Sequence, residues 1–179
     1  RQDALLLGSG VTQEAEELKQ RQIRELKRVF DASRAVGREL MVEIIASKHG
    51  PVADDTAARA VAEVYAAGIK PDWWKLEAQR TDAAWEALAA VIDREDPLCR
   101  GIVVLGLEAP EEELARSFAL AGRCRHVRGF AVGRTIFATP AREWLAGRLD
   151  DAGAVEAMAA NFAALVGAWE RAVARSSHG

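Results

Sequence analysis

Short apolar runs alternate with longer amphipathic segments along the whole chain. The apolar runs predict five strands, at residues 4–7, 39–45, 72–77, 101–107 and 129–133. Between them, apolar positions repeat with the helical period, which predicts helices over residues 12–36, 56–67, 82–93 and 109–121. The remainder, after residue 133, is also predicted to be helical, with Trp144, Leu145, Met158, Phe162, Leu165 and Trp169 among its apolar positions.

Residues that favour helix ends stand at the borders of these segments. Side chains that can accept hydrogen bonds from a first helical turn are Thr12, Asp54 or Asp55, and Thr81 or Asp82. Gly37 and Gly68 follow the first two helices, where glycine commonly ends a helix. The borders therefore agree with the apolar pattern.

The alternation of strands and helices predicts a parallel sheet flanked by helices. An open doubly wound sheet and a (β/α) barrel both fit this pattern. No G-x-G-x-x-G follows a predicted strand, so the dinucleotide-binding form of the open sheet lacks its best signal. The unusual residues lie at the ends of strands, where barrels carry their functional groups. The sequence therefore favours one α/β domain, residues 1–179, of the TIM-barrel type.

Composition and charge bear on which partners the protein could bind. Half of the 179 residues are hydrophobic and the net charge is −3, so nothing favours nucleic acid or an anionic membrane. No uninterrupted apolar run approaches the roughly 20 residues of a membrane span. Cys99 and Cys124 are expected to be free thiols in a reducing cytoplasm. The start of the chain lacks a methionine and a signal-peptide layout, which predicts a fragment, a processed form or an excised region.

Lys75 fits its surroundings least, because lysine is rarely buried and this one lies in the strand "DWWKLE". Side chains alternate along a strand, so Trp73, Lys75 and Glu77 share one face. A desolvated lysine amine is a nucleophile that forms Schiff bases with carbonyl compounds. The alternative is a structural ion pair of Lys75 with Glu77 or Glu43, and residue types alone favour that alternative.

Glu43 is a second charge in an apolar strand, "LMVEII". A carboxylate in such a run needs a partner, because burying an unpaired charge is costly. Carboxylates also transfer protons to and from substrates. Two separate strands that each place a charge in an apolar context indicate a functional site more strongly than either strand does alone.

The ends of the last two predicted strands carry a third candidate group. The strand "GFAVG" is followed by Arg134, and Gly106 holds the place of Gly133 in the preceding strand. Glycine lets the backbone approach a ligand, and arginine binds phosphate with two parallel hydrogen bonds. Phosphate sites in barrels use the loops after the last two strands. Gly106, Gly133 and Arg134 are therefore a predicted phosphate site.

Several segments together resemble a known family: "ELMVEII", "GIKPDWWKLE", "DPLCRGIVVLGLEAPEEEL", "GFAVGRTIF" and "WLAGRLDD". They resemble the C-terminal domain that is fused to the sugar kinase in 5-dehydro-2-deoxygluconokinase proteins of myo-inositol catabolism. That domain is in turn similar to the class I tagatose-1,6-bisphosphate aldolases. The resemblance covers about residues 12–173.

The resemblance implies roles for the candidate residues. Lys75, followed by Glu77, matches the Schiff-base lysine, and Glu43 matches the proton-shuttling glutamate. Gly133 and Arg134 match the phosphate-binding turn. The resemblance thus implies a class I aldolase that needs no metal or other cofactor. Its expected substrate is a phosphorylated keto-sugar acid such as 2-deoxy-5-keto-gluconate 6-phosphate, which yields dihydroxyacetone phosphate and malonate semialdehyde.

Two departures from the family affect this expectation. Residues 4–7 match the fourth strand of the family's barrel, so the chain is expected to hold the C-terminal five of eight strands. Another chain, a homo-oligomer or a longer protein would then complete the barrel, with a sugar kinase domain as fused or associated partner. Leu6 stands where the relatives have a lysine, which puts a second cationic substrate site in doubt.

Two other functions therefore remain open. One is a non-catalytic module that binds sugar phosphate or regulates an associated sugar kinase, and the other is a fragment without activity of its own. The chain has no GxxxxGK[ST] motif, so kinase chemistry is not expected from it.

Overall fold

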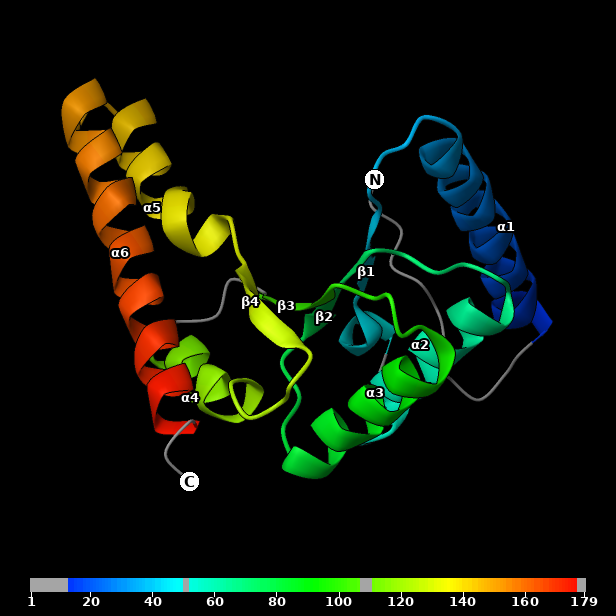
Figure 1. Cartoon of the computed structure of the whole chain (residues 1–179). Coiled ribbons are helices and arrows are strands. Elements are labelled where there is room, and N and C mark those ends of the chain that lie inside the picture. The colour runs from blue at the N-terminus through cyan, green and yellow to red at the C-terminus, as the bar shows by residue number, and fades with distance from the viewer. Residues whose placement is uncertain (1–12, 50–51, 107–110, 177–179) are drawn as a thin grey trace.

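A computed structural model describes residues 13–49, 52–106 and 111–176 of the chain (Figure 1). Its four strands are β1 (Met41–Ile44), β2 (Trp73–Glu77), β3 (Gly101–Leu105) and β4 (Val127–Ala131). All neighbouring strands are parallel, and they follow one another in chain order across one sheet. The predicted strand at residues 4–7, the Thr12 cap and Leu6 lie outside the described residues.

Six helices accompany the described strands. They are α1 (Gln13–Ala35), α2 (Thr56–Ala66), α3 (Asp82–Glu95), α4 (Glu111–Ala121), α5 (Arg134–Leu145) and α6 (Asp151–Ser176), and a short 3-10 helix, η1 (Ala46–His49), follows β1. The predicted parallel sheet with alternating helices is confirmed. A sheet whose strands progress in one direction does not have the reversal of strand order that defines a doubly wound sheet. The described strands form an open four-stranded sheet and not a closed barrel.

Two predictions about element ends are wrong. The last strand was expected at residues 129–133, but β4 ends at Ala131, and Gly133 is instead the N-cap residue of α5. Asp55 occupies the N-cap position of α2, yet its side chain accepts no hydrogen bond there and pairs with Arg59 at 3.3 Å. Thr81 does cap α3, because its hydroxyl accepts a hydrogen bond from the Ala84 N–H at 3.1 Å.

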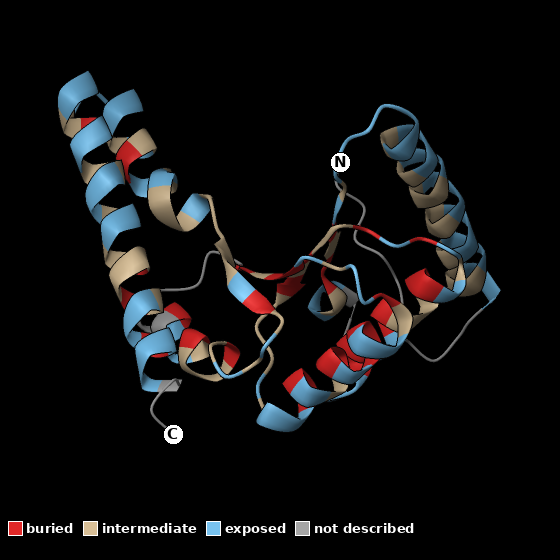
Figure 2. Ribbon diagram, viewed as in Figure 1, coloured by how far each residue is buried: buried red, intermediate tan, exposed pale blue. Residues whose placement is uncertain are grey.

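The sheet has two unlike faces. Strand register aligns Val42, Trp74 and Ile102 in one row and Ile44, Leu76 and Val104 in another, and all six are buried. These rows pack against apolar residues of α2 and α3, which lie together beside the sheet (Figure 1). Figure 2 shows buried residues concentrated in the strands, α2 and α3, whereas α1, α5 and α6 are mostly exposed or half-buried. The opposite face carries the alternate residues of each strand.

Trp74 joins β2 to α2 at the centre of the core. Its indole N–H donates a hydrogen bond to the Tyr65 hydroxyl at 2.8 Å, and the two rings meet edge to face at 5.4 Å. Burial raises the pKa of the Tyr65 hydroxyl, so this group stays protonated. The pair satisfies the one polar atom that the buried indole carries.

The C-terminal helices form a second layer of packing around aromatic rings. Phe118 of α4 stacks on Phe130 of β4 at 5.1 Å and meets Trp169 of α6 edge to face at 5.6 Å. By length and composition alone α6 could cross a membrane. It packs on the fold through Leu165, Ala168 and Ala172, which lie in the hydrophobic core cluster.

Asp72 ties three segments together at the start of β2. Its carboxylate accepts hydrogen bonds from the Leu40 N–H and from the Arg34 guanidinium, both at 2.8 Å. Burial favours the neutral acid and would raise the pKa of Asp72, but these two donors outweigh burial and hold that pKa below its usual value. One carboxylate therefore anchors the end of α1 and the entry to β1.

We expect Asp72→Ala to lower the free energy of unfolding by about 1–3 kcal/mol, because it removes the acceptor of a backbone N–H and the partner of Arg34. Urea denaturation at neutral pH measures the loss. Asp31→Ala is the control, since the exposed pair of Asp31 with Lys27 is worth only about 0.3–0.5 kcal/mol.

The difference in stability between the wild type and Asp72→Ala should also depend on pH. The pKa of Asp72 is lower in the folded than in the unfolded chain, so its stabilisation is present above the unfolded value of about 4. It is lost as the pH falls through the folded value. The difference between wild type and Asp72→Ala should therefore shrink on acidification, and a difference that grows would contradict this assignment.

Candidate functional site

Lys75 and Glu43 meet on the face of the sheet that α2 and α3 do not cover. The two residues are register partners in β2 and β1, and the Lys75 Nζ lies 2.9 Å from the Glu43 Oε1. Their side chains are 27% and 23% exposed, respectively. Both lie within short strands whose backbones are fixed by parallel pairing, β2 with β1 and β3, and β1 with β2. The structure thus joins the two charges that the sequence singled out.

Apolar and small residues continue this row of the sheet. Val103 of β3 is the register partner of Lys75, and Gly129 of β4 is the partner of Val103. Trp73 precedes Lys75 on the same face, half-buried, and its indole N–H donates to the Glu39 carboxylate at 2.9 Å. Trp74 packs under the helices instead, so the prediction that Trp73 shares a face with Lys75 is confirmed.

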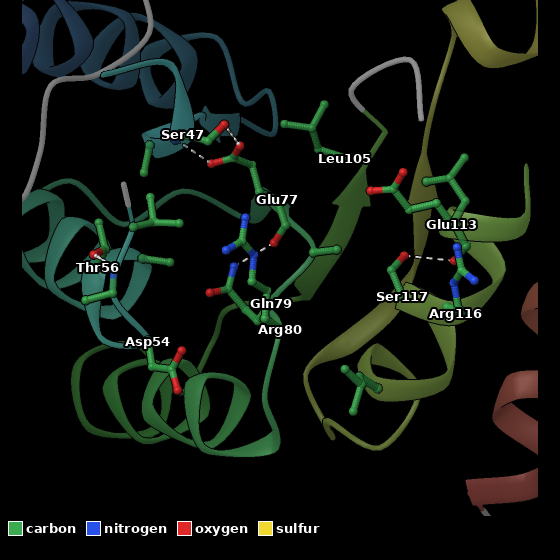
Figure 3. Close-up of a pocket in the computed structure, with 17 residues that line it drawn as sticks. Ser47, Asp54, Thr56, Glu77, Gln79, Arg80, Leu105, Glu113, Arg116 and Ser117 are labelled. Atoms are coloured by element: carbon green, nitrogen blue, oxygen red, sulfur yellow. Dashed lines mark hydrogen bonds between the residues drawn. The ribbon is translucent and has the colours of Figure 1, made fainter. Parts of the chain in front are cut away.

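Glu77 lies near the end of β2 but does not pair with Lys75. Its carboxylate accepts a hydrogen bond from the Ser47 N–H at 3.1 Å and another from the Ser47 hydroxyl (Figure 3). Of the two structural partners considered for Lys75, the observed one is therefore Glu43. Glu77 instead holds η1 against the carboxyl end of β2.

The predicted phosphate residues lie at the carboxyl ends of β3 and β4. Gly106 directly follows β3, Gly133 is the N-cap residue of α5, and Arg134 is exposed in the first turn of that helix. A Cβ on Gly106 would lie 2.5 Å from Cγ1 of Val132, so the segments that follow the two strands are in close contact. The positive end of α5 adds to the charge of Arg134 at this edge.

A cavity of about 400 Å³ opens at the carboxyl edge of the sheet (Figure 3). Its walls come from η1, the segment that leads into α2, the segment after β2, the end of β3 and one side of α4. They include Glu77 but neither Lys75 nor Glu43. Arg80 and Arg116 line it and were not predicted as site residues. Arg80 could have been found, because it lies three residues beyond a strand end, but Arg116 follows no local signal.

The described residues offer no metal site. No group of three or more His, Cys, Asp or Glu side chains converges in residues 13–49, 52–106 and 111–176. Cys99 and Cys124 are both free, and burial raises the pKa of each thiol, so neither is an activated nucleophile. The nucleophile that the site geometry presents is the Lys75 amine.

Comparison with known proteins places the chain in a bacterial family. The sequence model of the family described as "Uncharacterized protein conserved in bacteria (DUF2090)" matches residues 11–173, so the chain belongs to that family. No curated protein and no solved structure matched the chain.

We expect Gly106→Ala to lower the free energy of unfolding by about 1–3 kcal/mol, because the added methyl group overlaps the Val132 side chain. Thermal or urea unfolding measures the change. The double variant Gly106→Ala, Val132→Ala should recover part of the loss, since the nearest overlapping atom is then gone. Equal losses in the single and double variants would show that the contact with Val132 is not the reason for glycine.

Proposed function

We propose that this member of the family is a cytoplasmic class I aldolase domain whose Schiff-base nucleophile is Lys75. The observation that carries the proposal is the Lys75–Glu43 pair, an amine and a carboxylate 2.9 Å apart on the face of the parallel sheet that α2 and α3 do not cover. The four strands run in chain order, as successive strands of a (β/α) barrel do. We take them as part of such a barrel, with the face that carries Lys75 and Glu43 toward its interior.

The substrate class follows from the resemblance to sugar-phosphate aldolases. The proposed substrate is a phosphorylated keto-sugar acid such as 2-deoxy-5-keto-gluconate 6-phosphate, and the products are dihydroxyacetone phosphate and malonate semialdehyde. Gly106, Gly133 and Arg134 are the proposed phosphate site. Arg134 lies in the first turn of α5, where a guanidinium and a helix N-terminus both favour an anion.

The reaction balances without a cofactor. The Lys75 amine adds to the ketone and water leaves, which forms a protonated imine. A base removes the proton of the hydroxyl group on the carbon β to the imine carbon. The bond between the α and β carbons then breaks, malonate semialdehyde leaves, and the electron pair moves into the imine to give an enamine. Protonation of the enamine carbon and hydrolysis release dihydroxyacetone phosphate and restore the amine.

Glu43 is the proposed proton carrier of this sequence. Its carboxylate contacts the Lys75 Nζ directly, so it can take a proton from the amine as the carbonyl approaches and return one to the departing water. Glu77 was expected to share this work. Because its oxygens are held by Ser47, we assign it instead to positioning the end of β2.

A second candidate function is a non-catalytic module that binds sugar phosphate, associated with a sugar kinase. The observation in its favour is that the cavity at the carboxyl edge excludes Lys75 and Glu43. Binding of a phosphorylated ligand without turnover, by protein that gives no covalent adduct, would select this function over the aldolase.

Borohydride reduction in the presence of dihydroxyacetone phosphate should trap a covalent adduct on the peptide that contains Lys75, as mass spectrometry would show. Lys75→Met should abolish the adduct and the turnover. It should change the free energy of unfolding by no more than about 1 kcal/mol, because the ion pair is partly exposed. Lys27→Met, on the exposed side of α1, is the control and should trap as wild type does.

Glu43→Gln separates proton transfer from Schiff-base formation. Loss of a positioned acid–base group commonly costs about 10²–10⁴-fold in rate, so turnover should fall by that factor while slow trapping on Lys75 remains. Folded protein that gives no adduct on Lys75 would rule out the aldolase proposal, whatever the result with Glu43→Gln.

A further inference from the structure

The cavity at the carboxyl edge of β2 and β3 is walled by two arginines on opposite sides (Figure 3). Arg80 comes from the segment between β2 and α3, and Arg116 comes from α4. At about 400 Å³, the cavity is within the range of small-ligand sites in proteins. Because Lys75 and Glu43 are not among its lining residues, a ligand here would be separate from the proposed Schiff base.

Neither arginine side chain has a hydrogen-bond or ion-pair partner within the described part of the chain. Neighbouring arginines do pair, as Arg59 does with Asp55 and Arg123 with Asp82. Two forked donors that line one cavity from different elements are suited to bind a phosphate or carboxylate.

Carboxylates on the same walls limit what the ligand can be. Glu77 and Asp54 already accept hydrogen bonds from Ser47 and from Thr81, respectively, whereas Glu113 has no such partner among the described residues. Three carboxylates and two guanidiniums line the cavity, so a bare anion would meet repulsion as well as attraction. Carboxylate oxygens are, however, good acceptors for hydroxyl groups.

We propose that this cavity binds a small compound that carries one anionic group, phosphate or carboxylate, beside neighbouring hydroxyl groups. Arg80 and Arg116 hold the anionic group from two sides. Glu113, whose carboxylate has no partner among the described residues, accepts hydrogen bonds from the hydroxyl groups. The Gln79 amide donates to the Glu77 carbonyl at 2.6 Å and so fixes the segment that carries Arg80. This site goes beyond the proposed aldolase reaction, because it uses none of the groups that make or break the carbon–carbon bond.

Isothermal titration calorimetry with a matched set of probes tests the proposal: glycerol 3-phosphate, glycerate, glycerol and inorganic phosphate. None carries a ketone, so none forms a Schiff base. Glycerol 3-phosphate or glycerate should bind more tightly than inorganic phosphate, and glycerol should not bind. A preference for glycerol 3-phosphate assigns phosphate as the anionic group, and a preference for glycerate assigns carboxylate. If inorganic phosphate binds as tightly as glycerol 3-phosphate and glycerate do, the proposed ligand class is overturned.

Variants locate the binding. Arg80→Ala and Arg116→Ala should each lower the affinity for the more tightly bound probe by about 10–100-fold, which corresponds to the loss of a charged hydrogen bond. Arg28→Ala, which removes an exposed charge on α1, should have no effect, and Lys75→Met should bind as wild type does. Circular dichroism checks that each variant is folded, which is expected because all three arginines are exposed.

Arg134→Ala distinguishes this cavity from the proposed phosphate site of the aldolase. If binding is lost in Arg134→Ala but kept in Arg80→Ala and Arg116→Ala, the probe occupies the edge formed by α5 and the inference is overturned. Glu113→Gln should change the affinity for an anion in the direction opposite to the two arginine variants. It should strengthen binding of inorganic phosphate, because it removes a negative charge from the cavity wall without removing a hydrogen-bonding group.

Discussion

Burial of Trp74 and Leu76 fixes which face of β2 points toward the core. The positions of the candidate catalytic residues depend on this orientation. The Trp74 and Leu76 side chains are almost completely buried against the helices, and Trp74 is also held by its hydrogen bond to Tyr65. Because side chains alternate along a strand, Lys75 and Glu77 must then point to the other face. A slip of one residue would bury the Lys75 amine and expose a tryptophan, which is far too costly to compete.

Parallel pairing carries this constraint from one strand to the next. The backbone bond from the Trp73 N–H to the Leu40 carbonyl, at 3.2 Å, and the Asp72 carboxylate on the Leu40 N–H set the register of β1 against β2. That register brings Glu43 to Lys75 across the sheet. The ion pair of the site is thus a consequence of core packing and of a hydrogen-bonded clamp at the other end of the strands.

The carboxyl edge of the sheet holds a different kind of chemistry. There the strands have ended, and side chains from the connecting segments determine what a ligand would meet. Glu77 lies at this border: it shares a face with Lys75 along β2, yet Ser47 draws its carboxylate to the cavity at the edge. The molecule therefore separates the Lys75–Glu43 ion pair on the face of the sheet from a charged cavity at its carboxyl edge.

Local pattern was sufficient for most of the elements and for singling out two charged positions, but it did not decide whether Lys75 pairs with Glu43 or with Glu77. Apolar periodicity predicted the strands and helices, and charge in an apolar strand singled out Lys75 and Glu43. The apolar pattern placed β4 two residues too late, because a run of small apolar residues is equally typical of a strand and of the turn before a helix. It also placed Trp144 among the apolar positions of the C-terminal helices, whereas the indole is 46% exposed and donates to Asp151. Tertiary structure alone decided the partner of Glu77 and the presence of Arg80 and Arg116 on one cavity, because both depend on segments distant in sequence whose approach no local period encodes.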